Sequence, residues 1–216
     1  MTTTLPIVTE AQIREQQFIR LQDLSWQAYQ KLMAELGDNR VCRIAYDRGV
    51  LELRMPLQEH EQPKIVIADL VTAMADRLEI EIMQLGSLKL ERVDLSRAVE
   101  PDTCFYIQNE LKVRGIRNIR LPENPPPDLV IESDHTSSSL DKFSLYASIE
   151  VPELWRYRKK VLEVYQLQEG KYKRSQQSLA LPLFPIAEIP TYIEQSYEIG
   201  QRATVRKFKE QIRAIL

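Results

Sequence analysis

Acidic side chains stand at the end of one strand-like run of this sequence, and a lysine follows shortly after them. The segment PPDLVIESDHTSSSLDK carries Glu132 and Asp134 at the end of the run and Lys142 in the helix-like stretch beyond it. Carboxylate oxygens are the ligands that a hard divalent cation such as Mg²⁺ prefers. The acids therefore point to a cation site at the end of a strand.

The alternation of side chains along a strand decides which of these acids can act together. At about 3.3 Å per residue, Asp128 and Glu132 lie roughly 13 Å apart and cannot bind the same ion. Glu132 and Asp134 share a face about 7 Å apart at the backbone, so their carboxylates could converge. Leu129 and Ile131 face the other side, toward the core. Asp128 follows three prolines and is better explained as a turn residue.

A further carboxylate, Asp102, begins another strand-like run after a turn-forming proline in EPDTCFYI. A magnesium ion usually keeps several of its waters, so one or two carboxylates are enough to hold it. If the strand that starts near Asp102 and the strand that ends at Glu132 are neighbours in a sheet, both carboxylates can meet at one site. The sequence does not show this adjacency, which is an expectation for the structure.

Two helices and a hairpin are predicted in the first half of the chain. The segment DLSWQAYQKLMAELGD has Ser25 as its N-cap and Gly37 as its end. RVCRIAYDRGVLELRMP predicts a hairpin that turns at residues 47–49. In PKIVIADLVTAMADRLEI, Pro63 is expected at the first helical position, and apolar residues form one stripe. The stripe consists of Ile67, Leu70, Val71, Met74 and Leu78.

The remaining elements are mostly strands until the C-terminal helices. A strand turns at Gly86, another covers 103–108, and the proline-rich run LPENPPPD forms a rigid loop that leads into the strand DLVIE. A helix is predicted from about Ser138 to Ser148, followed by two or three antiparallel strands and a mostly helical end that breaks at Gly200. This order predicts a mixed α/β domain with a central mixed β-sheet flanked by helices.

The composition restricts the classes of function. The net charge of −2 gives no attraction of the whole protein to nucleic acid or to an anionic membrane, so such binding needs a local basic patch. One basic cluster consists of Lys112, Arg114, Arg117 and Arg120. No apolar run reaches the roughly 18 residues that span a bilayer, and the sequence shows no secretion signal. Two separate cysteines without a CxxC motif favour the reducing cytoplasm.

Together these motifs resemble a known group of enzymes. An acid at the start of one strand, an acid in the next and a nearby lysine resemble the PD-(D/E)xK nuclease superfamily. The pattern EPD…PPDLVIE…DK…Y…VPELWRY…VLEVYQL is more narrowly similar to the Uma-type family of restriction endonucleases, formerly a domain of unknown function. The resemblance covers roughly residues 24–212. It implies one restriction-endonuclease-like domain, 1–216, with its core at about 24–190 and a C-terminal helical segment, 191–216.

The resemblance also implies roles for individual residues. Asp102 and Glu132 would bind Mg²⁺, with Mn²⁺ as a substitute, and Lys142 would lie near the attacking water during hydrolysis of DNA. The superfamily pattern has its lysine two residues after the second acid, but Asp134 stands there in this chain. Lys142 then matches a lysine that has moved to the following helix, and Asp134 is a candidate third ligand. DNA is the implied partner, with no membrane involved, and nucleases of this fold often form homodimers.

Several of these residues also have simpler roles open to them. Glu132 could be a solvated strand end, and Lys142 an ordinary exposed helix lysine. His60, beside Glu59, could be an auxiliary catalytic group, because the first long helix often lines the site in this superfamily, or it could simply lie on the surface. The displaced lysine leaves a rival function, a catalytically silent DNA-binding or dimerisation module. Hydrolysis of RNA is a third alternative.

Overall fold

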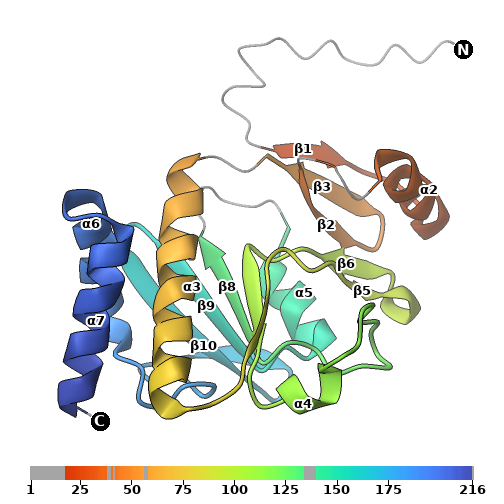
Figure 1. Ribbon diagram of the computed structural model, residues 1–216. Coiled ribbons are helices and arrows are strands. Elements are labelled where there is room, and N and C mark those ends of the chain that lie inside the picture. Colours follow the sequence, from red (N-terminus) through yellow and green to blue (C-terminus); the bar gives the residue numbers. More distant parts are fainter. Residues whose placement is uncertain (1–17, 38–39, 41, 56–57, 134–139, 216) are drawn as a thin grey trace, which may run out of the picture.

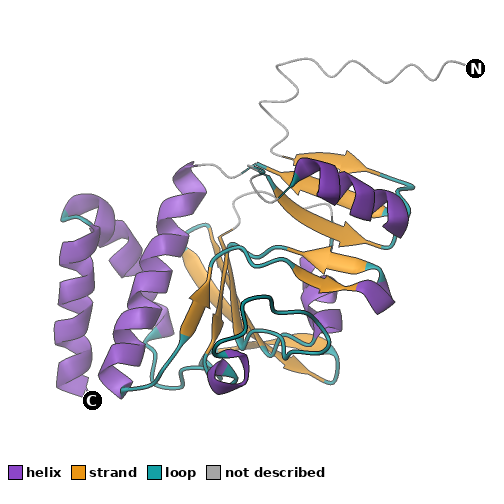
Figure 2. Cartoon of the chain, turned by 45° about the vertical axis from the view of Figure 1, so that its right-hand side comes forward, coloured by secondary structure: helices purple, strands orange, loops and turns teal. Residues whose placement is uncertain are grey.

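The computed structural model describes residues 18–37, 40, 42–55, 58–133 and 140–215, which form two β-sheets with helices packed against them (Figure 1). Sheet A has the strand order β1-β3-β2-β6-β5, and its neighbouring strands are all antiparallel. Its strands are β1 Phe18–Leu21, β2 Arg43–Asp47, β3 Val50–Arg54, β5 Leu90–Arg92 and β6 Arg97–Val99. The helix α2, Trp26–Leu36, covers one face of sheet A (Figure 2).

Sheet B has the order β11-β10-β9-β8-β7-β4 and is antiparallel except for the pair β8 and β9. Its strands are β4 Met83–Leu85, β7 Thr103–Tyr106, β8 Leu129–Ser133, β9 Glu153–Arg158, β10 Val161–Gln168 and β11 Lys171–Ser175. The helix α5, Lys142–Ile149, packs on one face of sheet B. On the other face lie α3 Gln58–Leu78, α6 Ile189–Glu198 and α7 Gln201–Ile215 (Figure 1).

The shorter elements lie in the connections. They are the helix α4, Glu110–Val113, and the 3₁₀ helices η1 Val93–Leu95 and η2 Ile186–Glu188. At one edge of sheet B, β11 pairs with β10 and with no other strand of the described residues. The side chains of Lys171, Lys173 and Arg174 are exposed along this edge strand.

The helix caps of α2 and the turn of the β2–β3 hairpin are present as the sequence predicted. The Ser25 hydroxyl accepts a hydrogen bond from the Ala28 backbone N–H at 3.2 Å and caps α2, and Gly37 ends the helix at φ 66°. The hairpin of β2 and β3 turns at Arg48 and Gly49, whose φ angles are 42° and 105°. Both angles lie in the left-handed region that a two-residue hairpin turn requires, and glycine adopts it without a steric penalty.

Two predicted helix starts are wrong. α3 begins at Gln58, so Pro63 lies inside the helix and not at its first position. Proline lacks the backbone N–H donor and is usually disfavoured inside a helix. The residues before it can still be helical, as they are here. α5 begins at Lys142 and not near Ser138, because the Asp141 carboxylate caps it by accepting from the Phe143 N–H at 3.1 Å. Residues 134–139 lie outside the described residues.

The central strand β8 is buried on both of its faces. Ile67, Leu70, Val71 and Met74 of the predicted α3 stripe pack in one cluster with Leu129 and Ile131 of β8, which confirms the predicted inward face of that strand. The opposite face is buried as well, because Val130 packs against α5. Every residue of β8 is therefore removed from water. None of the helices in the described ranges has the length and apolar character needed to cross a membrane.

Candidate active site

The two acids that the sequence singled out lie side by side on neighbouring strands. β7 and β8 pair antiparallel with Thr103 opposite Ile131, so Asp102, just before β7, stands opposite Glu132 of β8. The side chains are only 7% and 3% exposed, respectively. The expected adjacency of the two strands is thus present, and Asp102 and Glu132 form what we call the acid pair. Their burial argues against a role of Glu132 as a solvated strand end.

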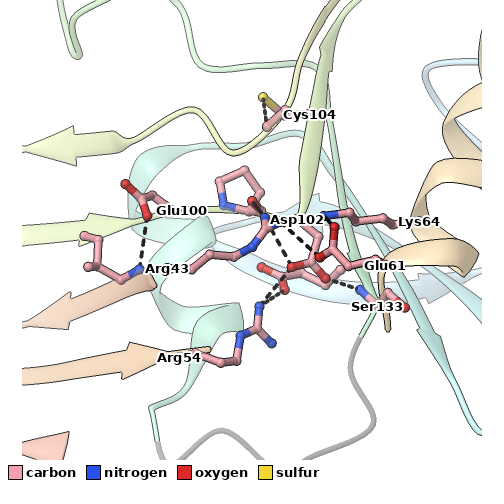
Figure 3. Close-up of polar contacts among 12 residues, drawn as sticks. Arg43, Arg54, Glu61, Lys64, Glu100, Asp102, Cys104 and Ser133 are labelled. Atoms are coloured by element: carbon pink, nitrogen blue, oxygen red, sulfur yellow. Dashed lines mark hydrogen bonds and ion pairs between the residues drawn. The ribbon is translucent and has the colours of Figure 1, made fainter. Parts of the chain in front are cut away.

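An arginine from sheet A lies between the two carboxylates. The Arg54 Nη2 atom, at the end of β3, is 3.0 Å from Asp102 Oδ1 and 3.4 Å from Glu132 Oε2. The other Asp102 oxygen, Oδ2, accepts the backbone N–H of Ser133 at 2.7 Å. We call the space between Asp102 Oδ1 and Glu132 Oε2, where Arg54 Nη2 lies, the cation position. Figure 3 shows Arg54 reaching Asp102 from the side of sheet A, opposite Ser133.

Helix α5 supplies two further groups to Glu132. Lys142 Nζ donates to Glu132 Oε2 at 2.7 Å, and the Tyr146 hydroxyl donates to Glu132 Oε1. The two donors are four residues apart, which places them on the same face of the helix. Lys142 is 8% exposed, so it is not an ordinary surface lysine. Burial, followed by the negative charge of Glu132, raises the pKa of Tyr146 well above its usual value and keeps the hydroxyl protonated as a donor.

A second arginine joins the acid pair to α3. Arg43 Nη1 lies 3.4 Å from Asp102 Oδ1 and donates to the Pro101 carbonyl at 2.6 Å, while Nη2 lies 3.5 Å from Glu61 Oε1. The same Glu61 carboxylate is 2.5 Å from Lys64 Nζ (Figure 3). Because β2, β3, β7, β8, α3 and α5 all contribute, the site lies where sheets A and B meet.

The donor set suits a hard divalent cation. Two carboxylate oxygens, Asp102 Oδ1 and Glu132 Oε2, already contact the same positively charged nitrogen, so they converge on one cation. Mg²⁺ is commonly held by one or two carboxylates together with waters. Among the described residues, no group of three or more histidine, cysteine, aspartate or glutamate side chains forms a metal site. The acid pair has the number of protein carboxylates with which a magnesium site can be built.

Several predicted residues lie outside the described parts of the site. Asp134 falls in the segment 134–139, and the side chains of Glu59 and His60 are not described, although both positions belong to α3. Asp128 is described and stands apart from the acid pair. Its carboxylate accepts the backbone N–H groups of Ile107 at 2.7 Å and Asn109 at 2.9 Å, which is the turn role expected for it.

The basic cluster Lys112, Arg114, Arg117 and Arg120 is not brought together with the acid pair. Asp102 precedes β7, whereas α4 and the cluster follow the opposite end of that strand. All four side chains are exposed, and Arg114 pairs with Glu110 at 2.6 Å. A nucleic acid bound by this cluster would therefore have to extend from one end of β7 to the other to reach the acids.

Arg54, Arg43 and Tyr146 were not predicted as site residues. Tyr146 had a usable signal, because it lies one helical turn after Lys142 and would share its face. The arginines had none, because the sequence does not indicate that the end of the β2–β3 hairpin in sheet A contacts the start of β7 in sheet B.

Comparison with known proteins agrees with the sequence motifs. Residues 26–191 match the model of the Uma2 family, whose description is "Putative restriction endonuclease". Four chains of solved structures match. One is the crystal structure of "a putative nuclease belonging to DUF820" from Anabaena variabilis, with 13% sequence identity, 84% of this chain and 98% of that chain covered, and a TM-score of 0.49. A search of the curated proteins gave no significant match.

Proposed function

Because the chain belongs to the Uma2 family, we propose that it is a metal-dependent endonuclease that hydrolyses phosphodiester bonds of DNA. The observation that carries this proposal is the convergence of Asp102 Oδ1 and Glu132 Oε2 on one cation, with Lys142 Nζ at 2.7 Å from the same glutamate oxygen. These residue types suit metal-assisted hydrolysis of a phosphodiester, which uses oxygen ligands for a divalent ion and a cation beside the reacting phosphate.

Each residue has a distinct task in the proposed reaction. The Ser133 N–H fixes Asp102 Oδ2 and the Tyr146 hydroxyl fixes Glu132 Oε1, so that the two remaining oxygens face the cation position. Asp102 and Glu132 would hold Mg²⁺ or Mn²⁺, which supplies charge neutralisation at the phosphate and acidifies an attacking water. Lys142 would stabilise the hydroxide nucleophile or the charge that develops on the phosphate.

The test is cleavage of plasmid DNA in Mg²⁺ or Mn²⁺ by the wild type and by Asp102→Asn and Glu132→Gln. We expect folded variants whose cleavage rate falls by about 100-fold or more, because each loses one charged ligand. Glu163→Gln is the matched control, since this partly buried acid pairs with Arg156 at 2.6 Å on the neighbouring strands. Metal-dependent cleavage that survives in either site variant would refute the assignment. A parallel assay on RNA separates the two phosphodiester substrates.

The rival function is a catalytically silent module that binds DNA or dimerises on the nuclease fold. One observation favours it: Arg54 already occupies the cation position. A Mn²⁺ titration of the wild type separates the two functions, because a silent module binds no ion at millimolar metal and the enzyme binds it through Asp102. In the enzyme interpretation, Lys112, Arg114, Arg117 and Arg120 remain proposed DNA contacts whose loss would reduce the salt dependence of binding.

A further inference from the structure

We propose that Arg54 is an internal cation that competes with the divalent metal, so that its contact with the acid pair and metal binding exclude each other. This inference rests on the proposed function, because it assigns a regulator to the same site. It makes the metal-free form a closed state in which a side-chain cation already occupies the metal's position. Metal affinity is then set by the displacement of Arg54 as well as by the two carboxylates.

The distances place Arg54 at the two oxygens that the metal would use. Arg54 Nη2 is 3.0 Å from Asp102 Oδ1 and 3.4 Å from Glu132 Oε2. A magnesium ion needs those oxygens at about 2.0–2.1 Å and fills its other positions with ordered ligands, usually water. A small crevice beside Arg54, lined also by Arg43, Glu52, Glu100 and Lys142, has a volume of only about 10 Å³, so Arg54 has little free space next to it. A partly hydrated ion can therefore enter only if a side chain moves away.

The charge balance selects Arg54 as the side chain that moves. Among the described residues, Arg54, Lys142 and Arg43 all contact the acid pair, so three cationic side chains already surround these two carboxylates before a dication arrives. Arg54 is 14% exposed and the two acids 7% and 3%, so water screens these charges poorly. Arg54 contacts both carboxylates through one nitrogen, which lies at the cation position itself. Its departure would therefore relieve the most repulsion there.

The position of Arg54 in the fold allows this departure. It is the last residue of β3, so a rotation of its side chain leaves the strand pairing intact. Its partner across the pair β2–β3 is Arg43, which places two like charges opposite each other. Like charges at directly opposite positions destabilise a strand pair, and the movement of one of them removes that cost.

The experiment measures Mn²⁺ affinity by electron paramagnetic resonance of the free ion at fixed salt, in the wild type, Arg54→Gln and Arg156→Gln. Arg156 is the matched control, because it stands opposite Glu132 on β9 but pairs with Glu163 at 2.6 Å. Each variant loses one guanidinium, but only Arg54→Gln empties the cation position. We expect Arg54→Gln to bind Mn²⁺ about tenfold or more tightly than the wild type, and Arg156→Gln to change less.

The outcomes separate this inference from a purely structural ion pair and from the proposed function. A structural role for Arg54 predicts unchanged or weaker Mn²⁺ binding in Arg54→Gln, and that result, or equal gains in both variants, overturns the competition.

If Arg54→Gln does not fold, NMR of the arginine Nε–H groups of the wild type decides the question. The Arg54 signal must move during a Mg²⁺ titration, and a constant signal at saturation overturns the inference. Tighter metal binding without DNA cleavage would sink the proposed function alone, whereas cleavage with unchanged affinity in Arg54→Gln would sink the competition alone.

Discussion

Tyr146→Phe removes one hydrogen bond to the buried Glu132 carboxylate without opening a cavity. A hydrogen bond to a charged group contributes about 1.5–3 kcal/mol to stability. Glu132 keeps Lys142 at 2.7 Å and Arg54 at 3.4 Å, so the carboxylate does not become an unpaired buried charge. We therefore expect the free energy of unfolding to fall by about 2 kcal/mol, within that range and below the 3–5 kcal/mol cost of a broken buried ion pair.

The matched control is Tyr172→Phe. The Tyr172 hydroxyl donates to a neutral acceptor, the Val151 carbonyl, at 2.7 Å, and such a bond contributes about 0.5–1.5 kcal/mol. Urea-induced unfolding at pH 7, followed by far-UV circular dichroism, measures both variants. For a chain of this size, 2 kcal/mol corresponds to a lowering of the melting temperature by about 4–8 °C.

A double-mutant cycle with Glu132→Gln identifies the charge as the cause. In the Glu132→Gln background the acceptor is neutral, so the cost of Tyr146→Phe should fall toward that of Tyr172→Phe, with a coupling energy of about 1 kcal/mol. The reasoning is refuted if Tyr146→Phe costs no more than Tyr172→Phe, or if its cost is the same with glutamate and glutamine at position 132.

Two further predictions concern groups away from the acid pair. Burial raises the pKa of Glu153, against the opposing effect of donors such as Trp155, so the native state holds this proton to higher pH than the unfolded state. The stability of the wild type relative to Glu153→Gln should therefore fall as the pH rises from about 4.3 through the raised pKa. Urea unfolding from pH 4 to 8 measures this difference, and the same pH dependence of the unfolding free energy in both proteins would contradict the prediction. Burial also raises the pKa of Cys104 to about 12, and its thiol donates to the Leu85 carbonyl at 3.0 Å. With a thiol reagent at pH 8, the partly exposed Cys42 should react in the native protein, and Cys104 should react only after unfolding. Rapid labelling of Cys104 in the native Cys42→Ser variant would contradict this.

Local chemistry made much of the secondary structure predictable. Ser25 and Gly37 mark the ends of α2, and the turn at Arg48 and Gly49 marks the hairpin, because caps and left-handed turns depend on residues close in the chain. Pro63 misled the prediction of the start of α3, since a proline at the first helical position is common but not required. The run through Gly86 passes from β4 in sheet B to β5 in sheet A, and no local signal distinguishes that path from a turn within one sheet.

The site could be predicted only where it follows strand alternation and the family pattern. The motifs indicated Asp102, Glu132 and Lys142 as candidate site residues. The pairing of β7 with β8 places the two acids together. The contribution of Arg54 depends on how sheet A packs against sheet B, which joins residues 48 and 78 positions apart in the chain. Such packing is set by the whole core and has no signature in a short segment.

The edge strand β11 has a consequence for how copies of this protein meet. An open strand edge is a template on which another chain can add a strand and begin aggregation. Here Lys171, Lys173 and Arg174 line that edge, so a second copy arriving in register would bring the same positive charges against them. This repulsion disfavours continuous sheet growth through β11 and does not act on association through other surfaces.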